Sequence, residues 1–83
     1  MKISFSLNEI STVYISIYDA SGNKIKVIKN GEVMNAGLNE IVWNLNNEFG
    51  NAVINGTYFV KVDVKSLSSG AAFSKVYKVF VAK

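Results

Sequence analysis

The sequence predicts an all-β fold, an antiparallel β-sandwich of about seven strands. Apolar and polar residues alternate with a period of two over several segments, as they do in strands that bury one face. Turn signals rich in Gly, Asn and Asp separate these segments every eight to twelve residues. Nowhere do apolar residues keep a helical spacing over eleven or more positions. These observations together are typical of immunoglobulin-like and fibronectin III-like sandwiches.

The first half of the chain contains three predicted strands. Residues 24–29 break the strict alternation, which a β-bulge or a switch between sheets would explain. Turns are predicted at residues 19–23, where Gly22 supplies a left-handed position, and at Asn30-Gly31. In the first two strands, over residues 2–7 and 12–19, every second residue is apolar and is predicted to face the core: Ile3, Phe5, Leu7, Val13, Ile15 and Ile17.

The second half opens with a predicted strand over residues 38–44 that carries Trp43. This residue is the only tryptophan, and we expect its ring at the centre of the core with its N–H bonded to a partner. A long polar loop with turns at Gly50 and Gly56 follows, and a short seventh strand is expected within residues 32–36 or 49–54. Two last strands, over residues 57–65 and 71–82, are predicted to bury Tyr58, Val60, Val62, Val64, Phe73, Tyr77, Val79 and Val81.

Length and composition limit what this chain does. Eighty-three residues make one domain with a modest core, and the absence of cysteine leaves no disulfide. The net charge of +3 comes from lysines that are spread along the chain, without any arginine. A nucleic-acid site would need a basic stripe, preferably with arginine, so no nucleic-acid partner is expected. No apolar run approaches the length of about 20 residues that a membrane span needs, so no membrane insertion is expected.

The residues that carry most enzyme chemistry are missing or scattered. The sequence contains no histidine, which excludes Ser–His and Cys–His nucleophiles and histidine metal sites. The six acidic residues fall in turns or at outward strand positions, and a small sandwich leaves little room for a cleft with two facing carboxylates. The glycines show no phosphate-binding spacing. We therefore predict a protein that is not an enzyme and holds no cofactor.

Two groups of residues are candidates for binding. Asn44, Asn47 and Glu48 lie in one oxygen-rich loop and form a weak candidate calcium site, because calcium prefers several oxygen ligands. The alternative is that their side chains cap the backbone of the loop in Asx turns. The outward aromatic residues form an apolar patch for a partner if several share one sheet face, and the alternatives are cross-strand pairing and sugar stacking. They are Tyr14, Tyr18, Phe59 and Phe80.

Several short motifs occur in one order along the chain. They are Ile3-Ser-Phe-Ser-Leu7, Val13-x-Ile15-x-Ile17-Tyr18-Asp19-x-x-Gly22, Ala36-Gly37, Trp43-Asn44 and Gly50-x-x-Val53-x-x-Gly56-x-Tyr58-Phe59. Together they resemble the FlgD-like immunoglobulin-like domain of bacterial flagellar hook-capping proteins. They are also similar to C-terminal modules of secreted bacterial proteins, including type IX secretion sorting domains. The family usually has Asp where this chain has Asn44 and Asn47, which puts a cation role of that loop in doubt.

The resemblance implies a seven-stranded sandwich without a catalytic centre, found at the C-terminal end of larger extracytoplasmic proteins. We therefore expect a non-catalytic accessory domain of a secreted or cell-surface bacterial protein. We also expect that the sequence is a fragment of a longer chain, to which Met1 was added as a start residue. Its expected partner is another domain of the parent chain or another protein. The alternatives are the structural domain of a hook-capping protein, a type IX secretion sorting domain and a carbohydrate-binding module.

Overall fold

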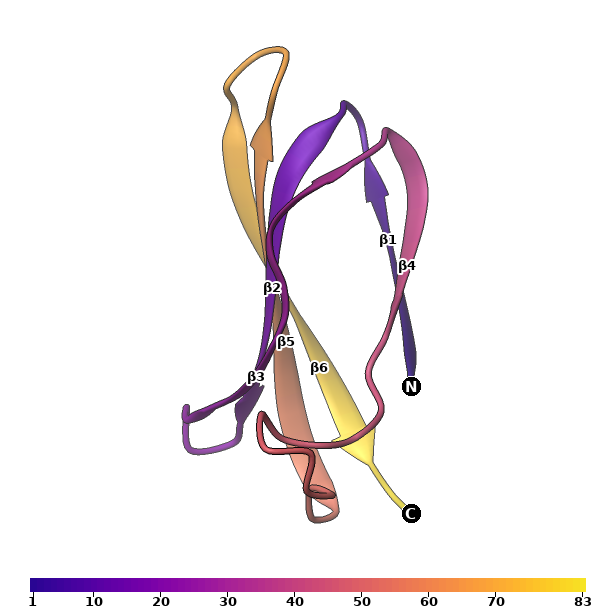
Figure 1. Cartoon of the computed structure of the whole chain (residues 1–83), viewed down its shortest axis with the longest axis vertical. Helices are drawn as coiled ribbons and strands as arrows, with labels where there is room; N and C mark the ends of the chain where they lie inside the picture. The colour runs from indigo at the N-terminus through magenta and orange to yellow at the C-terminus, as the bar shows by residue number, and fades with distance from the viewer.

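The computed structural model describes all 83 residues as a sandwich of two antiparallel sheets (Figure 1). A narrow sheet pairs β1 with β4, and a wide sheet has the order β3-β2-β5-β6. The chain forms no helix, and therefore none long and apolar enough to cross a membrane. The strands are β1 (Lys2–Leu7), β2 (Ser11–Asp19), β3 (Lys24–Met34), β4 (Gly37–Val42), β5 (Gly56–Ser66) and β6 (Ala72–Val81).

The antiparallel sandwich predicted from the sequence is confirmed, but it has six strands rather than seven. Neither expected position of the seventh strand holds one, because residues 32–34 continue β3 and the 49–54 segment makes only an isolated bridge between Asn46 and Ala52. The predicted turn at Asn30-Gly31 is also wrong. Gly31 has a φ of +80° inside β3, where it bulges out of the ladder instead of reversing the chain.

Strand β3 follows β2 through three irregularities. The register shifts leave Ile25, Ile28 and Gly31 without a partner on β2, one every three residues. Of the two explanations for the broken alternation of residues 24–29, a bulge or a switch between sheets, the structure shows bulges. Each bulge adds a residue to one side of the ladder, so that Ile25 and Ile28 both pack against the core.

The core lies between the sheets and follows the predicted alternation closely. Trp43 has no exposed surface, its Nε1–H donates to the Asn46 carbonyl at 2.9 Å, and its ring meets Tyr58 edge-on at 5.4 Å between centroids. The Tyr58 hydroxyl in turn donates to the Ile54 carbonyl at 2.7 Å. The buried set also contains every predicted inward residue of β1, β2 and β5: Ile3, Phe5, Leu7, Val13, Ile15, Ile17, Tyr58, Val60, Val62 and Val64.

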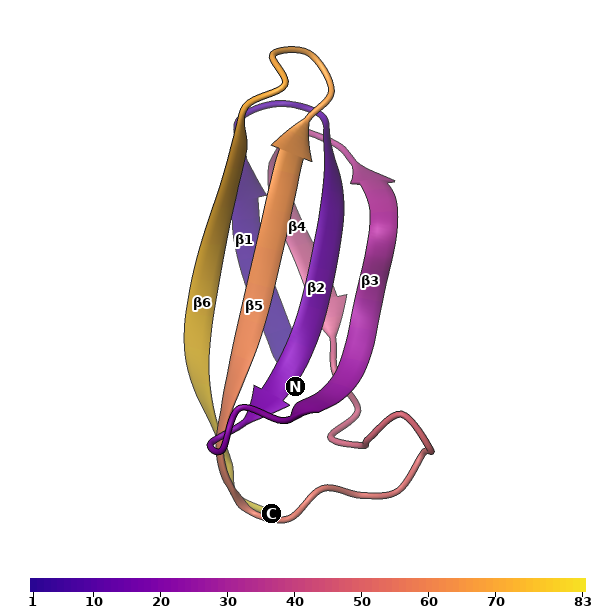
Figure 2. The ribbon, with the colours of Figure 1, turned by 90° about the vertical axis from the view of Figure 1, so that its left-hand side faces the viewer.

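The last strand is less covered than the sequence predicts. Of its predicted inward residues Val81 is buried, Tyr77 and Val79 are half-buried, and Phe73 keeps 52% of its surface exposed. The reason is the unequal width of the sheets. In Figure 2 the narrow sheet lies behind the middle of the wide one, so the outer strands β3 and β6 extend beyond it.

Candidate functional site

The four outward aromatic residues all lie on the outer face of the wide sheet. Tyr18 on β2 is directly opposite Phe59 on β5, and Phe80 on β6 is opposite Thr57, one pleat away from Phe59. Tyr14 lies four residues before Tyr18, about 13 Å along the strand, and is opposite Asp63. The structure therefore brings Tyr18, Phe59 and Phe80 together and leaves Tyr14 apart from them.

The three grouped residues differ in exposure. Tyr18 and Phe59 are half-buried against their neighbours, whereas Phe80 is 67% exposed. Lysines flank them: the Lys24 ammonium lies 6.0 Å from the centroid of the Tyr18 ring, and Lys78 is opposite Phe59. Tyr18 and Phe59 form a cross-strand pair, which explains why both are half-buried. Of the three aromatic residues, Phe80 on the edge strand β6 is the most exposed.

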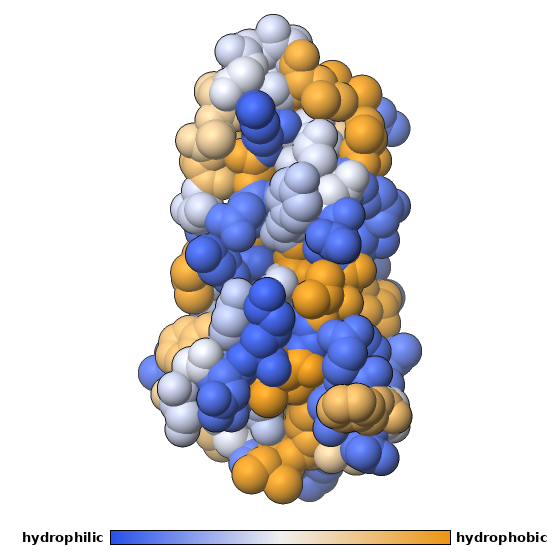
Figure 3. Space-filling view, turned by 60° about the vertical axis from the view of Figure 1, so that its left-hand side comes forward, coloured by the Kyte–Doolittle hydropathy of each residue, from blue (hydrophilic) through white to orange (hydrophobic).

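This side of the molecule is a mosaic rather than one apolar plane. In Figure 3 apolar areas alternate with hydrophilic ones over the outer face of the wide sheet. The register explains the pattern, because Ser16 and Lys61 lie between the row of Tyr18 and Phe59 and the row of Tyr14 and Asp63. A partner on this face would therefore meet small apolar contacts separated by polar groups.

The oxygen-rich loop uses its side chains to hold its own backbone. The Asn47 side-chain oxygen accepts from the amides of Phe49 and Asn51, both at 3.0 Å, which forms an Asx turn. One Glu48 carboxylate oxygen accepts from the Val27 amide on β3 at 3.0 Å. These are the capping interactions of the alternative interpretation, and they engage oxygens that a calcium ion would need.

The predicted turn glycines occupy left-handed positions. Gly22, Gly50 and Gly56 have φ values of +88°, +82° and +152°. Gly50 closes the turn that begins at Asn47, and Gly56 starts β5. Positive φ is costly for other residues, so these positions favour glycine.

The acidic residues do not meet in a cleft. Glu40 is exposed on β4, Glu48 bonds to β3 from the long loop, and Asp63 lies on the outer face of the wide sheet beside Lys61, at 3.9 Å. No three acidic residues lie close enough to hold a metal ion together. This arrangement offers no pair of facing carboxylates for acid–base chemistry.

At one end of the sandwich, Glu9 joins the β1–β2 connection to the β5–β6 hairpin loop. One carboxylate oxygen accepts from the hydroxyls of Ser66, at 3.1 Å, and Ser68, and the other accepts from Ser69 at 3.3 Å. The hydrogen bonds from Ser68 and Ser66 lower the pKa of the Glu9 carboxyl, against an opposing effect of desolvation. The pKa of Asp19 is lowered too, chiefly by its hydrogen bonds from Asn23.

These shifts predict a stability that falls in acid. A carboxyl whose folded pKa is below its unfolded value stabilises the fold above the unfolded pKa, and this contribution disappears as the pH falls through the folded pKa. Thermal unfolding followed by circular dichroism from about pH 6 to about pH 3 should therefore show a falling Tm. In Glu9→Gln the decline should be shallower. Ser68→Ala should also flatten it, and an unchanged slope in both variants would contradict the assignment to Glu9.

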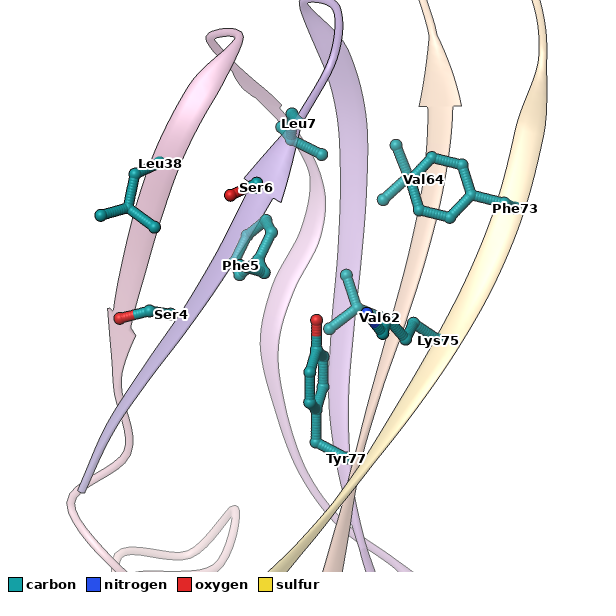
Figure 4. Close-up of a pocket in the computed structure, with 10 residues that line it drawn as sticks. All are labelled: Ser4, Phe5, Ser6, Leu7, Leu38, Val62, Val64, Phe73, Lys75 and Tyr77. Atoms are coloured by element: carbon teal, nitrogen blue, oxygen red, sulfur yellow. The ribbon is translucent and has the colours of Figure 1, made fainter.

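A groove between β1 and β6 was not anticipated from the sequence. It has a volume of about 370 Å³ and opens between the edges of the two sheets (Figure 4). Phe73, Lys75 and Tyr77 of β6 line one side, and Phe5 and Leu7 of β1 line the other. The signal in the sequence was Lys75, a charged residue at an inward position between two aromatic ones.

With this geometry in place, comparison with known proteins shows what the chain is similar to. A family model described as the FlgD Ig-like domain matches residues 1–68, which hold β1 to β5 and end before β6. No curated protein matched the chain. The crystal structure of FlgD from P. aeruginosa superposes with a TM-score of 0.75 and 24% sequence identity, over 93% of this chain and 56% of that one.

A second solved structure has the same fold in a larger setting. It is PorZ of Porphyromonas gingivalis, described as an essential bacterial surface component of the type-IX secretion system. The match has a TM-score of 0.52 and 19% identity, and covers 99% of this chain but 11% of PorZ. The chain thus spans about half the length of one solved relative and about a ninth of the other.

Proposed function

Since this chain belongs to the FlgD Ig-like domain family, we propose that it is a structural, non-catalytic domain of a hook-capping type of protein, which works by protein contacts outside the cytoplasm. The observation that carries this proposal is the family match over the five strands that build most of the core. It favours the hook-capping interpretation over the general accessory domain, which reverses the order expected from the sequence.

The surface supports a role in contact rather than in turnover. Phe80 is exposed at the edge of the wide sheet and lies diagonal to Phe59, which pairs with Tyr18 on β2 and with Lys78 on β6. We assign this cluster as the docking surface for a neighbouring domain or subunit. Aromatic residues are enriched in protein interfaces, and an exposed apolar patch rimmed by polar residues is typical of an interaction site, so the adjacent lysines would belong to its polar rim.

A second candidate function is an accessory domain of a larger secreted or surface protein. The likeness to one part of PorZ favours it, because that part is a small fraction of a surface component. In this case the domain would act as a spacer or a docking unit, and secretion sorting would be one form of that role.

Deleting residues 1–83 from the native gene separates these two functions. The hook-capping proposal predicts that filament assembly and motility are lost while secreted enzyme activities stay normal. The accessory function predicts normal motility and a change in secretion or attachment of a parent protein. If the isolated chain turned over a substrate, that result would contradict both functions.

The docking surface is tested in cells by photo-cross-linking. A benzophenone amino acid at Phe80 should cross-link to a structural subunit of the assembly or to a neighbouring domain, identified by mass spectrometry. The matched control is Phe49, which is 88% exposed on the long loop and should give no such product. Retention on insoluble polysaccharide that is lost in Tyr18→Ala and Phe59→Ala would instead identify a sugar-binding face.

A further inference from the structure

The groove between β1 and β6 lies beside a free sheet edge. Met1 and Trp43 exchange both backbone hydrogen bonds, at 2.7 and 2.8 Å, so they form a hydrogen-bonded pair of the β1–β4 ladder. Such pairs alternate along antiparallel strands. The N–H and C=O groups of Lys2, Ser4 and Ser6 must therefore point away from β4, toward the open side, where no strand pairs with them.

This edge is less protected than the others. Proteins usually guard edge strands with charged side chains, proline or bulges. β3 has three bulges, β4 carries Glu40 at its centre, and β6 carries Lys75 and Lys78. β1 pairs with β4 in a continuous register, and between its ends it has only serines and apolar residues.

The groove that accompanies this edge is lined mostly by apolar residues and contains one positive charge, that of Lys75. Its apolar residues include Phe5, Leu7, Val62, Val64, Phe73 and Tyr77. Figure 4 shows Phe73, Lys75 and Tyr77 on one side of the space, with Phe5 and Leu7 facing them from β1. Phe73 stays half exposed because nothing in the chain covers it.

The charge of the groove indicates what kind of partner binds there. Lys75 is the one charged residue that lines the groove, and neither β1 nor β6 contains an acidic residue. Lys75 lies 5.4 Å from the centroid of the Tyr77 ring and makes no ion pair, since the two ion pairs of the molecule are Lys29–Glu32 and Lys61–Asp63. A second copy of the chain would bring its own Lys75 to the contact and no acidic residue from β1 or β6, so like charges disfavour it.

We propose that the β1 edge binds an extended segment of a partner protein, which adds a third strand to the narrow sheet. The backbone of the segment would bond to Lys2, Ser4 and Ser6, its alternate apolar side chains would fill the groove, and a carboxylate among them would pair with Lys75. Strand addition of this kind takes affinity from the main chain and specificity from the pockets. The proposal rests on the assembly role proposed above and names a surface separate from the Phe80 cluster.

The first test uses two labelled peptides and the 83-residue chain. One is Thr-Val-Thr-Glu-Thr-Val-Thr, and the control has Lys in place of Glu. Fluorescence anisotropy should show the acidic peptide binding about tenfold more tightly, because one charge contact changes from attraction to repulsion. In NMR spectra the acidic peptide should shift the amides of Ser4 and Ser6 and slow their hydrogen exchange. No shift of these amides at millimolar peptide would overturn the proposal.

Two variants make the test specific. Ser4→Pro removes an N–H on the open side and leaves the bonds to β4 in place, so the chain should stay folded by circular dichroism and lose peptide binding. Lys75→Glu should reverse the preference between the two peptides. Binding that is unchanged in both variants, or concentration-dependent dimerisation through β1, would contradict the proposal. Cross-linking at Phe80 would be unaffected by Ser4→Pro, so the two proposals fail independently.

Discussion

Trp43→Ala is expected to lower the free energy of unfolding by about 3–5 kcal/mol. The ring is the largest fully buried side chain, so its removal leaves a cavity between the sheets. It also removes the edge contact to Tyr58 and leaves the Asn46 carbonyl without its donor. A domain of this size has a total stability of about 4–12 kcal/mol, so the variant should be marginally folded. Urea denaturation followed by far-ultraviolet circular dichroism measures the loss.

Two control variants separate the sources of this effect. Trp43→Phe keeps an aromatic ring in the core and removes the N–H, so its cost should be smaller, about 1–3 kcal/mol. Leu38→Ala changes a side chain that is 77% exposed, and should stay within about 0.5 kcal/mol of the wild type. If Trp43→Ala cost no more than Leu38→Ala, Trp43 would not be the centre of the core.

The core was predictable because it depends on local alternation. Val13, Ile15 and Ile17 have no exposed surface, and each was placed by the period of two alone. The same period placed Tyr14 and Tyr18 on the opposite face. Alternation assigns a residue to a face wherever one side of a sheet is buried, and it needs no knowledge of which strands are neighbours.

The end of β3 was not predictable in the same way. Asn-Gly is compatible with a two-residue reversal and with a glycine bulge, since both use positive φ. The choice is made by β2, whose backbone pairs with Asn30 and with Glu32 on either side of Gly31. Pairing with β2 therefore decided between the two conformations that Asn30-Gly31 allows. Because β3 continues through Gly31 to Met34, no separate strand begins at residue 32.

The candidate surfaces also depend partly on local alternation and partly on how distant strands pair. That Phe59 and Phe80 face outward follows from alternation, but the contact of Phe59 with Tyr18 depends on the register between β2 and β5. The groove beside β1 depends on how far the narrow sheet covers the wide one. No segment of the sequence encodes that quantity by itself, although an inward Lys75 indicates that its strand is incompletely covered.

Gly31→Ala is expected to cost about 2 kcal/mol, from two separate sources. The residue has a φ of +80°, which a side chain disfavours. A Cβ at this position would also lie 3.2 Å from the Tyr14 ring, closer than ordinary contact, so the ring would have to move. Gly70→Ala is the matched control, because Gly70 has a similar φ of +75° with nothing near its Cβ position. It should cost about 1 kcal/mol.

A double-mutant cycle with Tyr14→Ala isolates the contact. Without the ring, Gly31→Ala should cost no more than Gly70→Ala, so the interaction energy should be about 1 kcal/mol. Strictly additive costs would mean that Tyr14 does not lie over Gly31. The cycle also bears on the outer face, because Tyr14 is 45% exposed while its ring rests on the bulge. The conformation of β3 at Gly31 therefore determines how Tyr14 on β2 is presented to a partner.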